Sequence, residues 1–153
     1  YITGTVDILH ADKAYGDYSV REKLLSFYYT LVEVLKKDRS YVLVSLKDLK
    51  KKDLSPKFLS AFKSEFKEYI DELVAEGLET EEIVKRPLIT DRYYDGLWLQ
   101  LMFVINFWLK DDSTNFEKTD AAIEKSVNLS FELMGKGPLD MMVDFAKFLY
   151  QNR

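Results

Sequence analysis

The feature that most constrains the fold is residues 93–110, YYDGLWLQLMFVINFWLK, where large apolar side chains occupy almost every position. At 100° per residue, this segment places apolar groups on several sides of a helix, so the helix must be buried on several faces. Asp95, Gln100 and Asn106 interrupt it, and the uninterrupted apolar runs fall well short of the ~18 residues typical of a membrane span. The stretch is therefore predicted to be the central helix of an all-α domain that does not cross a membrane.

The composition fits one folded domain and narrows its chemistry. The aromatic share of 14% suits a large core or an aromatic-lined cavity. The net charge of −4 disfavours binding to the phosphate backbone of nucleic acid by this chain. With no cysteine and one histidine, His10, the usual nucleophile–base pairs are missing, and Asp7 with His10 gives too few ligands for a metal. We expect no enzymatic activity, no cofactor, no metal and a cytoplasmic location.

Capping signals in the first half of the chain predict two long helices. Ser19 and Glu22 form a capping box that opens a helix running to about residue 37. Ser55-Pro56 predicts the start of a second helix, with Gly77 as a left-handed cap at its end. Between them, residues 41–49 (YVLVSLKDL) are predicted to be a short buried helix, because no second strand exists to pair with them.

The second half contains two more helices after the central one. Thr114 and Glu117 form another capping box, which opens a helix from about residue 116 to Met134 that ends at Gly135. Residues 137–138 (Gly-Pro) separate a last helix over about 139–151. Its predicted inward face comprises Met142, Phe145, Phe148 and Leu149. The sequence thus predicts one all-α domain over residues 1–153 with about six to seven helices.

A mixed polar and apolar stripe on the central helix is the first candidate site. Its polar side chains, Asp95 and Asn106, must be satisfied either by other helices or by water or a ligand in a cavity. Ordinary core packing and a ligand pocket both remain open for these residues. The candidate ligand-binding residues, with aromatic side chains from two other helices, are Tyr28, Tyr29, Phe62, Phe66, Asp95, Trp98, Met102 and Asn106.

A seam for a homodimer is the second candidate. Apolar and small residues recur at three- and four-residue steps along residues 116–134, and this seam either packs inside the monomer or pairs with its copy across a two-fold axis. The opposite side of the central helix is expected to join it. The candidate interface residues are Tyr93, Leu97, Gln100, Val104, Ile123, Val127, Ser130, Phe131 and Met134.

Residues 21–42 (REKLLSFYYTLVEVLKKDRSYV) and 86–140 (RPLITDRYYDGLWLQLMFVINFWLKDDSTNFEKTDAAIEKSVNLSFELMGKGPLD) resemble the C-terminal regulatory domain of TetR-family transcriptional repressors. The resemblance extends over essentially the whole chain. It implies a homodimer formed through the two long helices of 86–140, and a small, often apolar effector. It also implies operator DNA binding by an N-terminal helix-turn-helix, which is absent from these residues.

The resemblance further implies that residues 1–9 are the tail of a helix that links the DNA-binding head to the body. Movement of this helix would transmit the effector signal. No individual ligand contact is implied, because effector domains of the family diverge widely. Two alternatives stay open: a helical lipid- or isoprenoid-binding protein of the same fold without DNA binding, and a helical interaction module whose cavity is filled core.

Overall fold

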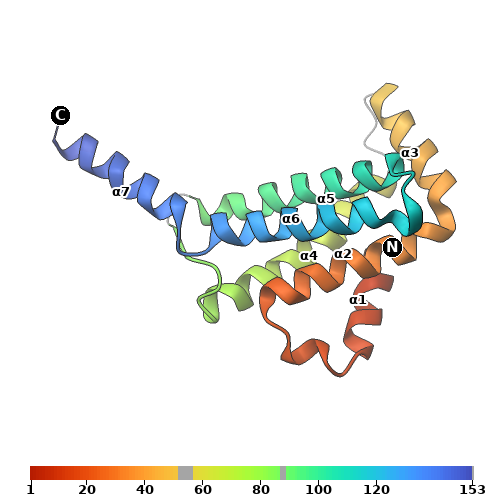
Figure 1. Ribbon diagram of the computed structural model, residues 1–153, viewed down its shortest axis with the longest axis horizontal. Coiled ribbons are helices and arrows are strands. Elements are labelled where there is room, and N and C mark those ends of the chain that lie inside the picture. Colours follow the sequence, from red (N-terminus) through yellow and green to blue (C-terminus); the bar gives the residue numbers. More distant parts are fainter. Residues whose placement is uncertain (52–56, 87–88, 153) are drawn as a thin grey trace.

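The structure, a computed structural model, describes residues 1–51, 57–86 and 89–152, which form seven α-helices and no strand (Figure 1). The all-α prediction and the expected number of helices are confirmed. No helix within these ranges is long and apolar enough to cross a membrane. The helices are α1 (Ile2–Ala11), α2 (Val20–Leu35), α3 (Arg39–Lys51), α4 (Lys57–Glu79), α5 (Tyr93–Lys110), α6 (Glu117–Met134) and α7 (Pro138–Gln151), with short 3₁₀ turns η1 (Tyr15–Asp17), η2 (Lys36–Asp38), η3 (Thr90–Arg92) and η4 (Thr114–Phe116).

Six of the described helices form a bundle, and the seventh leaves it. Helices α5 and α6 lie side by side, and α2 and α4 pack beneath them (Figure 1). Helix α1 packs against both α2 and α4. Helix α7 continues beyond the end of α6 and projects away from the bundle (Figure 1). The core is therefore built by α1, α2, α4, α5 and α6, to which α3 adds Val42.

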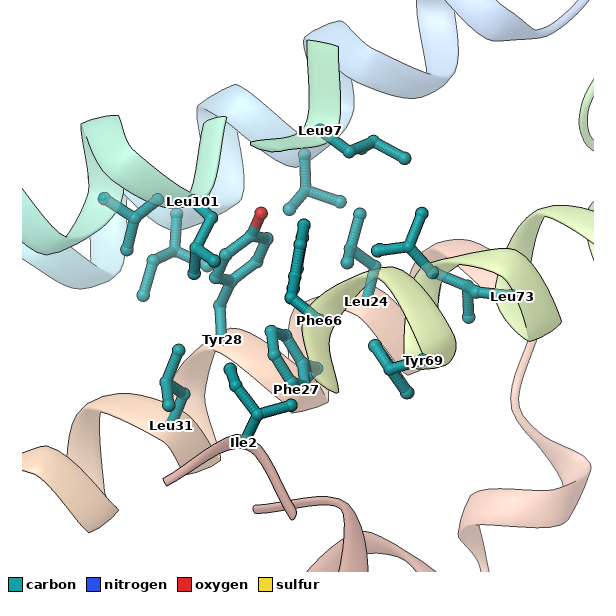
Figure 2. Packing of buried hydrophobic residues seen from close by; sticks show 14 of the residues in the cluster. Ile2, Leu24, Phe27, Tyr28, Leu31, Phe66, Tyr69, Leu73, Leu97 and Leu101 are labelled. Atoms are coloured by element: carbon teal, nitrogen blue, oxygen red, sulfur yellow. The ribbon is translucent and has the colours of Figure 1, made fainter. Parts of the chain in front are cut away.

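Aromatic side chains from α2 and α4 fill the centre of this core. Tyr28 and Phe66 have no exposed surface, and Figure 2 shows them between the helices, with Leu97 and Leu101 of α5 on one side. Burying one large apolar side chain in this way stabilises the folded state by roughly 1.5–3 kcal/mol. The prediction that residues 93–110 form a buried central helix is only partly fulfilled, because one side of α5 remains open to solvent. Phe103 on that side is 48% exposed.

The first predicted capping box is confirmed at the start of α2. The Ser19 hydroxyl accepts the backbone N–H of Glu22 at 3.2 Å, and the Glu22 carboxylate accepts the backbone N–H of Ser19 at 3.0 Å. The hydrogen bond from the Ser19 backbone holds the pKa of Glu22 below its ordinary value. The carboxylate of Glu82 also accepts the N–H of Val20 at 3.0 Å, so the segment after α4 helps to cap α2.

The second predicted capping box is wrong. Asn115 and Phe116 both have positive φ, 53° and 56°, and no Thr114 side-chain cap forms. Asp111 caps α6 instead: one carboxylate oxygen accepts the backbone N–H of Thr119 at 2.9 Å and its hydroxyl at 2.6 Å. The other carboxylate oxygen accepts the N–H of Ser113 at 2.8 Å. A carboxylate with two acceptor oxygens satisfies this turn more completely than one threonine hydroxyl.

The two glycines predicted to end helices behave differently. Helix α6 ends at Met134 with Gly135 as its cap, as predicted. Helix α4 continues past Gly77, so the predicted left-handed cap there is wrong. A Cβ at Gly77 would lie only 2.5 Å from Cδ1 of Ile83, so the glycine makes room for the returning chain. The predicted cap at Ser55-Pro56 lies outside the described residues.

Two helices are more exposed than the sequence predicted. Residues 41–49 lie within a helix, α3, but Tyr41 and Val44 are both 57% exposed. The predicted inward face of α7 is also exposed, because this helix projects past the end of the bundle and no described helix covers it (Figure 1). Its residues are Met142, Phe145, Phe148 and Leu149, with exposed fractions of 67%, 62%, 58% and 53%.

Candidate functional site

Four of the predicted ligand-binding residues lie together where α4 meets α5. The ring centroids of Phe62 and Phe66 lie 6.3 Å and 6.0 Å from that of Trp98. Met102, one turn farther along α5, lines a small cavity with Phe62. Trp98 and Met102 are half-buried, so the α5 side of this cluster lies at the edge of the core, whereas Phe66 is fully buried. Ligand binding by these residues stays a prediction.

The polar members of the predicted stripe find partners on α5 or in the turn η3 just before it. The Asn106 amide donates to the carbonyl oxygen of Met102 at 2.9 Å. Asp95 is exposed and accepts a hydrogen bond from Arg92 at 3.4 Å. Tyr29 is 37% exposed, and its hydroxyl donates to the Asp120 carbonyl at 3.5 Å. Asp95 and Tyr29 therefore lie apart from the Phe62–Trp98 cluster.

The cavity beside Met102 is enclosed by apolar side chains of four helices, α2 to α5, and by the start of the chain. Its volume is about 20 Å³, enough for no more than about one water molecule. Tyr1, which precedes α1, contributes to the lining, and its hydroxyl donates to the Asp38 carboxylate at 3.0 Å. Only Phe62 and Met102 were predicted. The lining residues are Tyr1, Leu35, Val42, Leu46, Leu59, Phe62, Met102 and Ile105.

A much larger open groove of about 930 Å³ lies between α5 and α6. Its walls carry exposed large apolar side chains, and its charged lining residues are all cations, Arg92, Lys118 and Lys125. The exposed apolar residues along it are Leu99 (68%), Phe103 (48%), Leu129 (60%) and Leu133 (46%). None of these four was predicted as a site residue. The i,i+4 pair Leu129 and Leu133, which follows Ala121, Ala122 and Ser126 on α6, is the sequence signal that marks this face.

The predicted dimer-interface residues divide between this groove and the core. Val104, Ile123 and Val127 have no exposed surface in the single chain, so they pack inside it and leave no area for a partner. That is the monomer alternative that the sequence left open for the seam on residues 116–134. Phe131 is half-buried and packs against the core cluster. The remaining five, Tyr93, Leu97, Gln100, Ser130 and Met134, line the base of the groove, and all of them except Ser130 are buried in the single chain.

A chain of buried and partly buried hydrogen bonds connects the groove with the core. The Tyr28 hydroxyl donates to Oε1 of Gln100 at 3.0 Å, and Nε2 of Gln100 donates to the Ser130 hydroxyl at 2.8 Å. Ser130 in turn donates to the carbonyl oxygen of Ser126 at 3.0 Å. Burial raises the pKa of Tyr28 well above its ordinary value, so this hydroxyl keeps its proton. Helices α2, α5 and α6 are thereby linked through side chains.

Comparison with known proteins identifies the domain type. A family model described as "Tetracyclin repressor-like, C-terminal domain" matches residues 23–149. No curated protein and no solved structure gives a match. The match covers most of α2, all of α3 to α6 and most of α7, and it includes the groove lining and every lining residue of the small cavity except Tyr1. The chain therefore belongs to the tetracyclin repressor-like C-terminal domain family and is a C-terminal domain of the TetR-family regulator type.

Proposed function

We propose that this chain is the effector-sensing and dimerisation domain of a TetR-like transcriptional repressor. The family match over residues 23–149 carries the proposal. In this proposal the domain binds a small, largely apolar ligand and relays its presence to an N-terminal DNA-binding head on a longer chain. The family is one of regulators rather than enzymes, and the proposal gives this chain no catalytic role.

The groove face of α5 and α6 is the proposed homodimer surface. Four large apolar side chains along it are 46% to 68% exposed, and a continuous apolar surface of this kind is typical of a protein–protein contact. A two-fold axis across this face would bury the same residues on both copies. The proposal therefore moves the interface from Ile123 and Val127 to Leu129 and Leu133, which lie on a different side of α6.

The small cavity beside Phe62 and Met102 is the proposed starting point of the effector site. All of its lining is apolar, which supports an apolar ligand. Because its volume is only about 20 Å³, a ligand larger than water must separate α3 or α4 from α5 to enter. Such a ligand selects a more open conformation, and it shifts the protein only by its difference in affinity for the two conformations.

Tyr1 offers a physical route for the relay. It lines the cavity and precedes α1, and its hydroxyl is held by Asp38 at 3.0 Å. A ligand that widens the cavity would displace this side chain and the start of α1. In the proposed full-length repressor, that movement changes the position of the DNA-binding head. By linkage, the ligand then lowers operator affinity by the same coupling free energy.

A binding experiment with the fluorescent apolar probe 1-anilinonaphthalene-8-sulfonate tests the effector site. Met102→Trp fills the cavity, and we expect it to weaken probe binding by about tenfold. The probe would lose its apolar contact with the cavity wall, which contributes roughly 1–2 kcal/mol to the free energy of binding. Ile8→Trp is the control: Ile8 is 53% exposed on α1 and lines neither the cavity nor the groove, so this variant should bind the probe like wild type. Far-UV circular dichroism checks that both variants fold. Equal binding by Met102→Trp and wild type would remove the cavity as the effector site.

A lipid- or isoprenoid-binding protein of the same fold is the second candidate. The observation that favours it is the open apolar groove of about 930 Å³ with three cations in its lining, which suits an acyl chain with an anionic headgroup. The gene sequence upstream discriminates between the two. A helix-turn-helix encoded there supports the repressor, and a sequence without one supports the lipid-binding protein. In solution, binding of oleate with conversion of a dimer to monomers would also favour the lipid-binding protein.

A further inference from the structure

The apolar face of α7 is the largest feature that the proposed function leaves without a role. Within residues 141–151, five large apolar side chains fall in an arc of about 120° at 100° per residue. Their exposed fractions lie between 53% and 73%. An amphipathic helix with its apolar side open to water needs a partner surface. These five residues, here named the arm face, are Met141, Met142, Phe145, Phe148 and Leu149.

The groove between α5 and α6 is a matching surface on the same chain. Helix α7 has 14 residues and is about 21 Å long, and the 18 residues of α6 extend about 27 Å, so the helix fits along the groove. The charges also agree: Asp144 borders the arm face, and the groove lining contains Arg92, Lys118 and Lys125 without a carboxylate. Shape, apolar character and charge therefore pair the two surfaces.

The position of α7 indicates that the arm face of one copy pairs with the groove of a second copy. Only residues 135–137 separate α7 from α6, whose last residues, Leu133 and Met134, line the end of the groove. From there α7 projects away from its own bundle (Figure 1). A two-fold axis across the groove face places the arm of each copy over the groove of the other. The arm is then a continuation of the proposed dimer surface.

We propose that α7 is an exchanged arm, whose face of Met141, Met142, Phe145, Phe148 and Leu149 docks in the α5–α6 groove of a second copy of this chain. This inference rests on the dimer of the proposed function and names the element that fills its groove. Each copy contributes a helix to the other, and the contact forms twice.

Sedimentation equilibrium of matched variants tests the exchange. Phe145→Glu places a charge in the centre of the arm face, and we expect the dimer dissociation constant to rise by at least about tenfold. Tyr150→Glu is the control: it makes the same kind of change on an equally exposed aromatic residue of α7, about 140° away from Phe145. It should leave the dissociation constant unchanged. Leu129→Glu, in the groove, should weaken the dimer as Phe145→Glu does.

The pattern of results separates the exchange from the dimer itself. If Leu129→Glu dissociates the dimer and Phe145→Glu does not, the dimer stands and the exchanged arm is overturned. If the wild-type chain is a monomer at about 100 μM, where a contact of even micromolar affinity would be saturated, both proposals fail. If Phe145→Glu and Tyr150→Glu weaken the dimer equally, the arm face has no special role and the exchange is again overturned.

Cysteine cross-linking identifies which surfaces meet, and the absence of native cysteine gives a clean background. Copies with only Phe145→Cys are mixed with copies with only Leu129→Cys, and a short bismaleimide is added. The exchange predicts a cross-linked heterodimer and little product from either variant alone. Self-cross-linking of either variant shows that like helices meet, and it overturns the exchange. A chain with both cysteines that cross-links only within itself shows that α7 folds back, which also overturns the exchange.

Discussion

The guanidinium of Arg86 donates to the backbone carbonyl oxygen of Gly135 across 2.8 Å, and so fixes the end of α6 to the segment before α5. The same side chain donates to the carbonyl oxygens of Leu133 and Met134 at 3.3 Å and 3.2 Å. It also donates to the Tyr93 hydroxyl at 2.7 Å. A buried cation at the carbonyl end of a helix satisfies its last acceptors and complements the helix dipole. Arg86 thus holds the end of α6, from which the chain continues into α7, in place.

We expect Arg86→Met to lower the free energy of unfolding by about 2–4 kcal/mol, because several buried carbonyl oxygens and the Tyr93 hydroxyl lose their donor. Urea denaturation measures this loss. Lys85→Met is the control, since Lys85 is adjacent and exposed, and it should change the free energy by less than about 0.5 kcal/mol. Equal stability of the two variants would contradict the capping role of Arg86.

Gln100 is expected to stabilise the chain through its hydrogen bonds to the buried Tyr28 and the partly buried Ser130. Gln100→Leu removes the acceptor of the Tyr28 hydroxyl and the donor to Ser130, and we predict a loss of about 1–3 kcal/mol. Tyr28→Phe removes the other end of the first bond. In the double variant the losses should be less than additive, since the phenol is no longer left without an acceptor. A double-mutant cycle by urea denaturation measures this, and strictly additive losses would show that the bond contributes nothing.

Asp111 makes stability depend on acid pH. Burial is the largest single effect and raises its pKa, but the hydrogen bonds from Ser113 and Thr119 together outweigh burial and hold the pKa well below the ordinary value. A carboxyl group whose pKa is lowered by folding stabilises the folded protein at pH values above the pKa of the unfolded chain, about 3.9. This stabilisation is lost as the pH falls below that value towards the pKa of the folded state.

The test compares thermal unfolding of wild type and Asp111→Asn between pH 2 and pH 7. We expect wild type to be the more stable protein at neutral pH, because the amide offers one acceptor where the carboxylate offers two. The difference in melting temperature should shrink below about pH 4 as the carboxylate is protonated. A constant difference over the whole range would exclude the ionised carboxylate as the cap of α6.

Gly77 is predicted to be required for close packing rather than for a turn. A Cβ there would lie 2.5 Å and 2.8 Å from two carbons of the buried Ile83 side chain, so Gly77→Ala should destabilise by about 1–3 kcal/mol. Gly96→Ala in α5 is the control, because a Cβ there meets nothing within 4 Å. It should stabilise by up to about 1 kcal/mol through helix propensity. Gly77→Ala with Ile83→Val should recover part of the loss, and no recovery would refute the steric explanation.

Much of the fold could be predicted because helix signals are local. The Ser19–Glu22 box and the end of α6 at Gly135 depend on residues within one turn, and both are confirmed. The box at Thr114 failed because a better acceptor, Asp111, lies three residues upstream and competes for the same turn. For the candidate site, the structure places Phe62 and Phe66, two of the predicted ligand-binding residues, next to Trp98. Whether a ligand binds there stays a prediction.

By itself, the sequence determined that this protein is a helical bundle, where most of its helices begin and end, and which positions of each helix are apolar. Only the tertiary structure decided which apolar stripe lies inside: Val127 is fully buried, and Leu129, two residues later, is 60% exposed. It also brought Arg86 to Gly135, 49 residues away. The physical reason is that periodicity fixes the faces of a helix, whereas the neighbours that cover each face come from distant parts of the chain.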